Sequence, residues 1–457
     1  MSSESQVIEL PTASIAARLE RLPVCSVHYR LLIACGMGWL FDAMDVGIVT
    51  FALAPIAKEW KLSPAQVGLV GSSGLAGMFV GAAVAGMLAD RLGRKSVFQF
   101  TLLLFAVATL LCAVAQNFHQ MLAFRFLVGI GLGGELPVVS SLLSEFVPSA
   151  KRGRFIVLLE SFWAYGWLVA SLVAFFVIPH HGWRIAFTIG AIPAIYIWIV
   201  RRSVPESPRW YASRGRYAEA NAVVSELEIE VAQVTRQDLP PVQEDSTIGS
   251  SGNIARRGFR QLWSPAYRRH TIVLWVLWFG LVFGYYGVFV WLPSLLVKAG
   301  YSMVNSFLYV LIITIAQIPG YFSAAYLIDR VGRRPVIAGF LVLSAVSAVI
   351  FGLSSTTAQI LCWASLMSFF NLGAWGAVYT YTPELYPTAF RATGTGSAAA
   401  IGRIGGMIAP VLVGLMLPYV GRPGVMVLNA AMLAMAGICV AVLGPETKGK
   451  PLEELAL

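Results

Sequence analysis

The sequence predicts an all-α membrane protein whose twelve transmembrane helices form two similar six-helix bundles. Of the 457 residues, 57% are hydrophobic and only 12% are charged, whereas a soluble domain carries roughly 45–50% apolar and about 25% charged residues. Apolar stretches of about 20 residues, enough to cross a membrane as a helix, recur along the chain. Three short motifs also return in the second half at a nearly constant offset. Long apolar runs favour helices over barrel strands.

The expected spans lie on either side of a central polar segment. In order along the chain they cover 29–52, 66–89, 97–115, 120–144, 155–178, 184–200, then 270–297, 305–328, 336–354, 358–382, 394–417 and 424–443. The resulting organisation is a tail over 1–28, a bundle over 29–202, a linker over 203–268, a bundle over 269–445 and a tail over 446–457. Residues 217–230 of the linker are expected to form a short amphipathic helix.

Basic residues determine the expected orientation. If the N-terminus is cytoplasmic, 26 of the 33 lysines and arginines lie on cytoplasmic tails and loops. Cytoplasmic loops of membrane proteins are enriched in these residues, so both termini are expected in the cytoplasm. The enrichment of basic residues in cytoplasmic loops explains the net charge of +10, so no nucleic-acid partner is expected. Because no apolar core precedes Pro23, no cleavable signal peptide is expected.

Several kinds of chemistry have no sequence signal. The five cysteines are scattered and form no C-x-x-C pair, which argues against disulfides and metal ligation. The adjacent histidines His180 and His181 do not have metal-ligand spacing, and no phosphate-binding loop or nucleophile elbow is found. We therefore expect no enzymatic activity, no cofactor and no metal site.

The two halves share three motifs. DRLGRK from Asp90 recurs 239 residues later as DRVGRR from Asp329. EFVPSAKR from Glu145 recurs at the same offset as ELYPTAFR from Glu384, while PES and PET close the halves 240 residues apart. Two halves of like orientation are typical of transporters, with the substrate site between them near the membrane midplane.

These motifs resemble those of the major facilitator superfamily, above all its sugar-porter and metabolite–proton symporter branches. WLFDAMDVGIV from Trp39, GLGGELPV from Gly131 and LLESFWAYGW from Leu158 are similar to bacterial niacin transporters. The run from Glu384 also resembles animal organic-ion transporters. The resemblance implies a monomer in the lipid of a bacterial inner membrane. It would import nicotinate, and potentially nicotinamide, by alternating access with proton symport.

Two charged residues are expected to pair inside the membrane. A charge at the bilayer centre costs on the order of 2.5–3.5 kcal/mol, so each such residue needs a partner or a function. At about 1.5 Å per residue, Asp45 and Arg125 both lie ~10 Å from the outer ends of their spans. In related symporters the matching pair links protonation of the acid to release of the arginine, which implies that Asp45 carries the proton. The alternative is a permanent structural salt bridge.

Asp42 lies three residues before Asp45 and therefore on the same helix face. Two neighbouring carboxylates resist ionising together. Asp42 is expected to act as a second proton site or to shape the substrate cavity. Hydrogen bonding to the helix backbone is the alternative.

Arg403 is the expected substrate anchor. It lies about 15 Å from the cytoplasmic end of its span, near the midplane, and its counterpart in the first half is Ala164. The resemblance to organic-anion transporters implies that it faces the cavity, and a guanidinium suits a carboxylate. The alternative is an ion pair with Glu160 or Glu135.

Aromatic and amide side chains are expected to complete the site. An aromatic acid would stack on aromatic rings and bind a few polar groups, although lipid or core packing is as good an interpretation for each ring alone. The substrate-binding candidates besides Arg403 and Asp42 are Trp163, Tyr285, Tyr286 and Trp375, with Gln317 and Asn371 for a pyridine nitrogen.

Charged residues near the cytoplasmic loops are expected to act as gates. Ion pairs among them would set the balance between inward-facing and outward-facing states. The glycine run Gly129-x-Gly131-x-x-Gly134 lacks a preceding strand, so it indicates close helix packing, not a nucleotide site. The gating candidates are Asp90, Arg94, Glu135, Glu145, Arg154, Glu160, Asp329, Arg333, Glu384 and Arg391.

Three other functions stay open from the sequence. The Asp42 and Asp45 pair is also similar to symporters of benzoate-type aromatic acids. A multidrug or organic-ion exporter would share the fold. A non-transporting sensor would too, although the retained loop motifs favour a protein that cycles.

Overall fold

The computed structural model describes residues 15–192, 195–196, 204–242, 258–386 and 391–448, and every regular element in them is a helix. The first half holds α2 (Ser26–Trp60), α3 (Pro64–Leu92), α4 (Arg94–Ala113), α5 (Phe118–Phe146) and α6 (Ser149–Gly190). The second half holds α11 (Arg268–Phe289), α12 (Leu292–Lys298), α13 (Met303–Ile315), α14 (Gln317–Arg330), α15 (Arg333–Leu353), α16 (Thr357–Glu384) and α17 (Arg391–Leu443). The other helices are α1 (Ile15–Glu20), α8 (Pro208–Ser213), α9 (Tyr217–Thr235) and α10 (Gly258–Gln261).

The helices have the length and surface of membrane spans. In the described ranges, 10 helices are long and apolar enough to cross a membrane. Along α4, the large apolar side chains of Phe100, Leu103, Val107 and Leu110 are exposed at intervals of three or four residues. A soluble protein rarely exposes such a continuous apolar stripe. The chain is therefore a multi-span membrane protein.

Two of the long helices are broken at equivalent glycines. Gly182 in α6 has a φ of 78° and Gly421 in α17 has a φ of 61°. These positive φ values suit glycine because it lacks a Cβ atom. The two glycines are 239 residues apart, the offset of the repeated motifs. The expected span 184–200 lies partly outside the described residues.

Two expected spans are divided in the structure. The stretch 270–297 forms α11 and α12, and Pro293 lies in the first turn of α12. The stretch 305–328 forms α13 and α14, which are separated at Ala316. Pro319 explains the second break. Proline has no backbone N–H to donate to the Ile315 carbonyl oxygen, and in a continuous helix its ring would clash with that carbonyl group.

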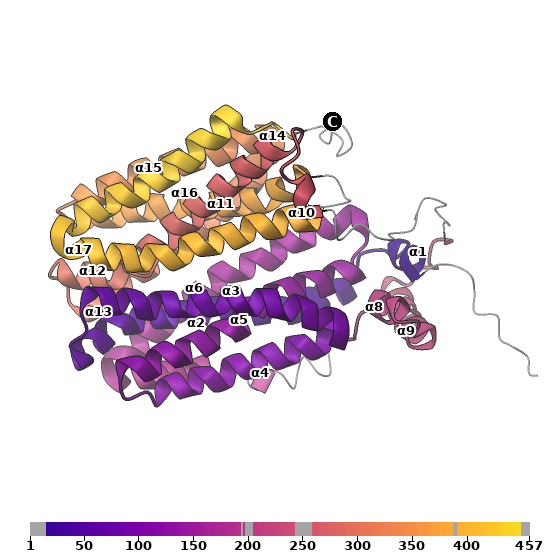
Figure 1. Cartoon of the computed structure of the whole chain (residues 1–457). Coiled ribbons are helices and arrows are strands. Elements are labelled where there is room, and N and C mark those ends of the chain that lie inside the picture. The colour runs from indigo at the N-terminus through magenta and orange to yellow at the C-terminus, as the bar shows by residue number, and fades with distance from the viewer. Residues whose placement is uncertain (1–14, 193–194, 197–203, 243–257, 387–390, 449–457) are drawn as a thin grey trace, which may run out of the picture.

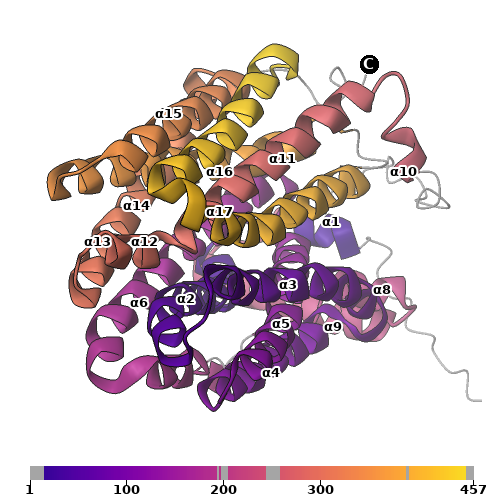
Figure 2. The same ribbon diagram turned by 60° about the vertical axis from the view of Figure 1, so that its left-hand side comes forward.

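The two halves have the same internal packing. In the first half α2 packs on α6 and α3 on α5, and in the second α11 packs on α17 and α14 on α16 (Figures 1 and 2). A Cβ atom at Gly81 would lie 2.1 Å from the Ile130 carbonyl oxygen, and one at Gly320 would lie 2.2 Å from that of Phe369. Both pairs are related by the same 239-residue offset.

The glycine run of α5 has the packing role expected of it. A Cβ atom at Gly129 would lie 2.0 Å from the Gly74 carbonyl oxygen, and one at Gly133 would lie 2.0 Å from that of Met78. Small residues let helix backbones approach closely inside a membrane. Gly129 and Gly133 therefore join α5 to α3, whereas Gly131 packs against Phe105 of α4.

One end of the molecule, here called the linker end, carries α1, α8, α9 and α10 (Figure 1). There α1 docks on α9, because Arg18 and Arg21 both form ion pairs of 2.6 Å with Glu228. Burial alone would raise the pKa of the Glu228 carboxyl group, but the two arginines hold that pKa below its ordinary value. The helix expected over 217–230 is present and continues to Thr235.

At the opposite end, here called the far end, the halves meet through α3 and α17. The Ser72 hydroxyl donates a hydrogen bond of 2.7 Å to the Met407 carbonyl oxygen. Nearer the far end, a Cβ atom at Gly414 would lie 2.5 Å from the Pro64 carbonyl oxygen. The backbones of the two helices are thus in close contact there.

Candidate functional site

A cavity of about 190 Å³ lies between the two halves, midway along α3 and along the part of α17 that precedes Gly421. Helices α2, α3, α5 and α6 line it from one side, and α11, α16 and α17 from the other. The contact between Ser72 and Met407 lies just beyond it toward the far end. The lining residues are Trp39, Leu75, Met78, Ser140, Trp163, Trp278, Val282, Tyr286, Trp375, Tyr379, Ala399, Arg403 and Gly406.

Arg403 is the charged residue of this lining. Its Nη1 atom donates a hydrogen bond of 2.9 Å to the Met78 carbonyl oxygen across the boundary between the halves. Among the residues described, no carboxylate lies within ion-pair distance of its guanidinium. The ion pair with Glu160 or Glu135, the alternative weighed from the sequence, is therefore absent from the described structure. The arginine presents a cation to the cavity.

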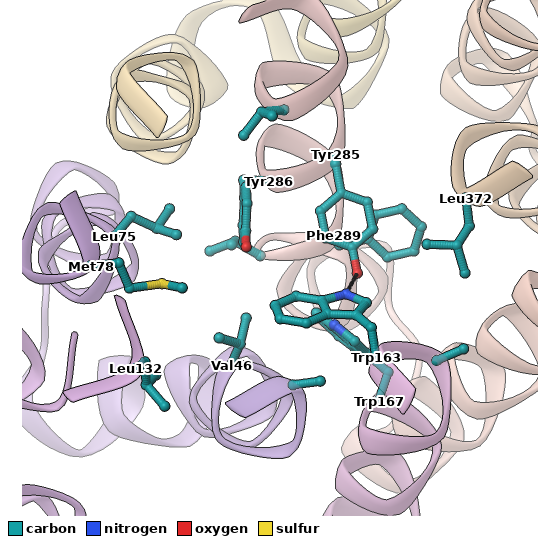
Figure 3. Close-up of a cluster of buried hydrophobic side chains, with 14 of the residues drawn as sticks. Val46, Leu75, Met78, Leu132, Trp163, Trp167, Tyr285, Tyr286, Phe289 and Leu372 are labelled. Carbon is teal, nitrogen blue, oxygen red and sulfur yellow. Dashed lines mark hydrogen bonds between the residues drawn. The ribbon is translucent and has the colours of Figure 1, made fainter. Parts of the chain in front are cut away.

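Aromatic rings form much of the wall. The Trp163 indole N–H donates a hydrogen bond of 3.1 Å to the Tyr285 hydroxyl, and so links the halves (Figure 3). The ring centroid of Trp163 lies 4.8 Å from that of Trp39, and that of Trp375 lies 5.2 Å from that of Tyr285. Tyr285 is 1% exposed and supports the wall from behind, whereas Tyr286 lines the cavity.

The Asp45 and Arg125 side chains form an ion pair away from the cavity lining. The distance from Arg125 Nη1 to Asp45 Oδ2 is 2.7 Å, and the two side chains are 3% and 0% exposed. The Thr109 hydroxyl donates a further hydrogen bond of 3.3 Å to Asp45 Oδ1. The geometry expected from their equal depth is therefore present. The exchange of a proton on Asp45 stays a prediction.

Asp42 does not line the cavity. It is 0% exposed on α2 and faces Glu135 of α5, which is also 0% exposed. Glu135 thus lies against a neighbouring helix inside the bundle, not among the arginine motifs of the linker end.

The two amides expected to bind a ring nitrogen lie outside the lining. Gln317 and Asn371 are 0% and 2% exposed, and neither lines the cavity. Glu160 is buried on α6, close to Trp39 and Tyr379. It lies one helical turn from Trp163, on the same face of α6. Of these polar residues, Glu160 is the one beside the lining.

The arginine motifs form one cluster in each half at the linker end. The distance from Arg94 Nε to Glu145 Oε1 is 3.3 Å, and that from Arg333 Nη2 to Glu384 Oε1 is also 3.3 Å. Arg333 also pairs with Asp329 at 3.4 Å. Arg154 is exposed. The side chains of two further candidates, Asp90 and Arg391, lie outside the described residues.

The PES and PET motifs supply partners that the sequence analysis did not assign. Glu206 accepts hydrogen bonds from the backbone N–H groups of Arg94 and Lys95 at 2.9 and 3.1 Å. Glu446 accepts those of Arg333 and Arg334 at 3.0 and 3.1 Å. A carboxylate is favourable at a helix N-terminus, where N–H groups lack partners. The nearly equal offsets of the arginine motifs and of PES and PET, 239 and 240 residues, were the available signal.

The cluster is completed by two hydroxyl groups. Ser207 donates to Glu145, and Thr447 donates to Glu384. Each glutamate therefore binds both an arginine and the segment that closes its half. The arrangement repeats because both segments repeat.

Comparison with known proteins identifies a transporter family and, within it, relatives that are named as niacin transporters. The model of the family "Sugar (and other) transporter" matches residues 42–457. The chain is 49% identical to a niacin transporter of Acinetobacter baylyi over 97% of its own length and 100% of that protein. It is 43% identical to a putative niacin/nicotinamide transporter of Bacillus subtilis, over 93% and 98% of the two chains.

A solved structure has a similar arrangement of helices. The partially occluded, inward-open xylose transporter XylE from E. coli matches with a TM-score of 0.75. The match covers 93% of this chain and 100% of the other, at 19% sequence identity. At that identity the likeness concerns the fold.

Proposed function

Because the chain belongs to the sugar (and other) transporter family of the major facilitator superfamily, we propose that it imports nicotinate through the cavity between its halves. The relatives named as niacin transporters support this substrate. Nicotinate is a single aromatic ring with one carboxylate. Its chemistry matches a small aromatic cavity with one cation.

The observation that carries the proposal is the position of Arg403 in the cavity lining and its lack of a carboxylate partner among the described residues. A guanidinium fork binds a carboxylate through two parallel hydrogen bonds. The ring of the substrate then lies between Trp163, Tyr286 and Trp375, where aromatic faces hold it by stacking.

A ligand panel tests this assignment. Thermal unfolding of the purified protein is measured with nicotinate, nicotinamide and benzoate, because a ligand that binds the folded form raises its apparent stability. Nicotinate is expected to stabilise the protein most. Arg403→Gln removes the shift from both acids, and Arg216→Gln on the exposed linker keeps it. A nicotinate shift that survives Arg403→Gln would contradict the proposal, and equal shifts from both acids would favour the benzoate-type alternative.

The polar end of the pyridine ring has a separate partner. Glu160 lies beside the lining residues Trp39 and Tyr379. It would recognise the ring nitrogen through one shared proton, because a carboxylate and a pyridine nitrogen are both acceptors. Benzoate has no such nitrogen. We therefore assign Glu160 to the discrimination between the two acids, in place of Gln317 and Asn371.

The transporter is in an inward-facing state when the linker end is cytoplasmic. The basic residues of the linker and of both arginine motifs support that orientation in a bacterial inner membrane. With α3 and α17 in contact at the far end, the cavity communicates with the cytoplasmic side. The clusters of Glu145 and Glu384 then hold the cytoplasmic end of each half together as the halves rock.

Proton symport rests on the buried pair of Asp45 and Arg125. Protonation of Asp45 neutralises its charge, so the 2.7 Å contact with Arg125 weakens and the helices can move. The breaks at Gly182 and Gly421 divide α6 and α17, which supports twelve spans arranged as two six-helix bundles. A cavity formed by the helices of one chain suits a monomer.

A further inference from the structure

The most unusual feature outside the cavity is a pair of buried carboxyl groups between α2 and α5. Asp42 and Glu135 are each 0% exposed. All four of their carboxyl oxygens lack a hydrogen-bond donor in the part of the chain that is described. Burying an unpaired carboxylate is costly. The pair therefore requires an explanation.

A glycine on α2 brings the two groups together. Gly38 and Asp42 are four residues apart and face α5 from one side of α2. A Cβ atom at Gly38 would lie 2.1 Å from Glu135 Oε1. The Glu135 side chain thus occupies the space that this glycine leaves open, and its carboxyl group reaches hydrogen-bonding distance of Asp42.

Two carboxylates cannot hydrogen-bond to each other, since both groups are acceptors when ionised. One proton between them supplies the missing donor and removes one of the two negative charges. Carboxyl pairs that share a site commonly hold a single proton for this reason.

Several charged and titratable groups face the pair. Cys35 and Asp45 lie on α2, and Arg125 holds the charge of Asp45 in its own ion pair. The remaining groups that act on the pair are Arg403 on α17, Tyr286 on α11 and Tyr196. Among these, Arg403 is the cation that is not already paired with a carboxylate in the described structure.

We propose that Asp42 and Glu135 form a second proton site, which holds one shared proton while the cavity is empty and takes up a second proton when substrate binds. The inference rests on the proposed function of Arg403. While the cavity is empty, the Arg403 guanidinium attracts negative charge on Asp42. When a substrate carboxylate binds Arg403, that attraction is cancelled. The pair then binds a second proton from water, which forms an O–H bond on the carboxyl group that was still ionised.

Infrared spectroscopy tests the shared proton without substrate. The wild-type protein is expected to show the carbonyl band of a protonated buried carboxylic acid at neutral pH. Glu135→Gln removes that band, and Glu226→Gln on the exposed linker leaves it. If the band is absent from the wild type, or if it is unchanged in both Glu135→Gln and Asp42→Asn, the shared proton is refuted.

Proton uptake on binding tests the link to Arg403. Nicotinate is titrated by calorimetry in buffers of different ionisation enthalpy, which counts the protons bound with it. The wild type is expected to take up about one proton per nicotinate at neutral pH, and Glu135→Gln about none while it still binds. Unchanged uptake in Glu135→Gln would overturn the link. If the wild type binds no nicotinate, the proposed function is refuted, whereas the infrared evidence for the shared proton remains valid.

Discussion

Arg403 of the second half donates a hydrogen bond of 2.9 Å to the backbone carbonyl oxygen of Met78 in the first half. This contact uses one of the five N–H donors of a guanidinium. It also orients the group across the cavity, so that a bound carboxylate would contact a residue tied to both halves. Binding and the relative position of the halves are thereby connected at one side chain.

The first prediction concerns Asp45. Asp45→Asn removes the negative charge of the 2.7 Å contact with Arg125, so proton binding at this position is lost. Exchange of nicotinate across liposome membranes is expected to continue, while accumulation driven by a pH gradient is abolished. The exposed Asp238→Asn, the same chemical change in the linker, is expected to accumulate normally. Accumulation by Asp45→Asn at the wild-type level would favour the permanent salt bridge.

The second prediction concerns Glu160. Glu160→Leu can neither share a proton with a pyridine nitrogen nor donate a hydrogen bond to it, so the preference for nicotinate over benzoate is expected to fall by about tenfold, on the order of 1.4 kcal/mol. Competition by unlabelled acids against labelled nicotinate measures this ratio. Gln317→Leu serves as the comparison, because Gln317 lies outside the lining. A preference changed by Gln317→Leu and unchanged by Glu160→Leu would assign recognition of the ring nitrogen to Gln317 instead.

The third prediction concerns helix packing. Gly320→Ala places a Cβ atom 2.2 Å from the Phe369 carbonyl oxygen, so it is expected to destabilise the protein by about 1–3 kcal/mol. Gly339 on α15 has no atom within 4 Å of such a Cβ atom. Gly339→Ala is therefore expected to be neutral or to stabilise by up to about 1 kcal/mol. Thermal unfolding in detergent compares them, and equal losses would contradict the packing account.

The fourth prediction concerns the docking of α1. The pKa of Glu228 is lowered by Arg18 and Arg21, so its stabilisation is fully present above the ordinary glutamate value of about 4.3. It is lost as the pH falls through the lower pKa of the docked state. Distances between spin labels on α1 and α9 are expected to lengthen in that range. Glu228→Gln should remove this pH dependence and Glu226→Gln keep it. The same transition in Glu228→Gln would exclude Glu228 as its origin.

The fifth prediction concerns the linker-end clusters. Glu145→Gln weakens the contact with Arg94, which lies far from the cavity lining. The uptake rate is expected to fall about tenfold, since a population shift of 1.4 kcal/mol has that effect, while nicotinate affinity stays within about threefold. Uptake and equilibrium binding measured on one preparation separate the two. A loss of affinity equal to the loss of rate would place Glu145 in the binding site.

Most of the helices could be predicted from the apolar runs and the repeated motifs, because a segment that crosses a lipid bilayer as a helix must be long and apolar. The breaks within the second half were missed although Pro293 and Pro319 marked both of them. A proline inside an apolar run has little effect on hydropathy. It does remove a backbone donor, and that local effect divides α13 from α14.

Charges inside the spans were the best guide to the site. Arg403 lines the cavity and Asp45 contacts Arg125. A charged side chain inside a span is stable only beside a partner or a cavity, so its position is strongly restricted. Neutral polar groups were a poorer guide, because Gln317 and Asn371 can be buried on any face of a helix. Trp39 and Tyr379 were not among the predicted binding residues. Tryptophan and tyrosine are also common at the membrane–water interface, so the residue type alone does not identify those that line a cavity.

The central claim is that this chain moves nicotinate together with protons. Its most direct test is uptake of labelled nicotinate by liposomes that contain the purified protein, with an inward proton gradient and with none. The account predicts accumulation above equilibrium with the gradient, collapse when a protonophore is added, and no uptake by Arg403→Gln. Uptake that only equilibrates in both conditions would contradict proton symport, and no uptake at all would contradict the assignment of the substrate.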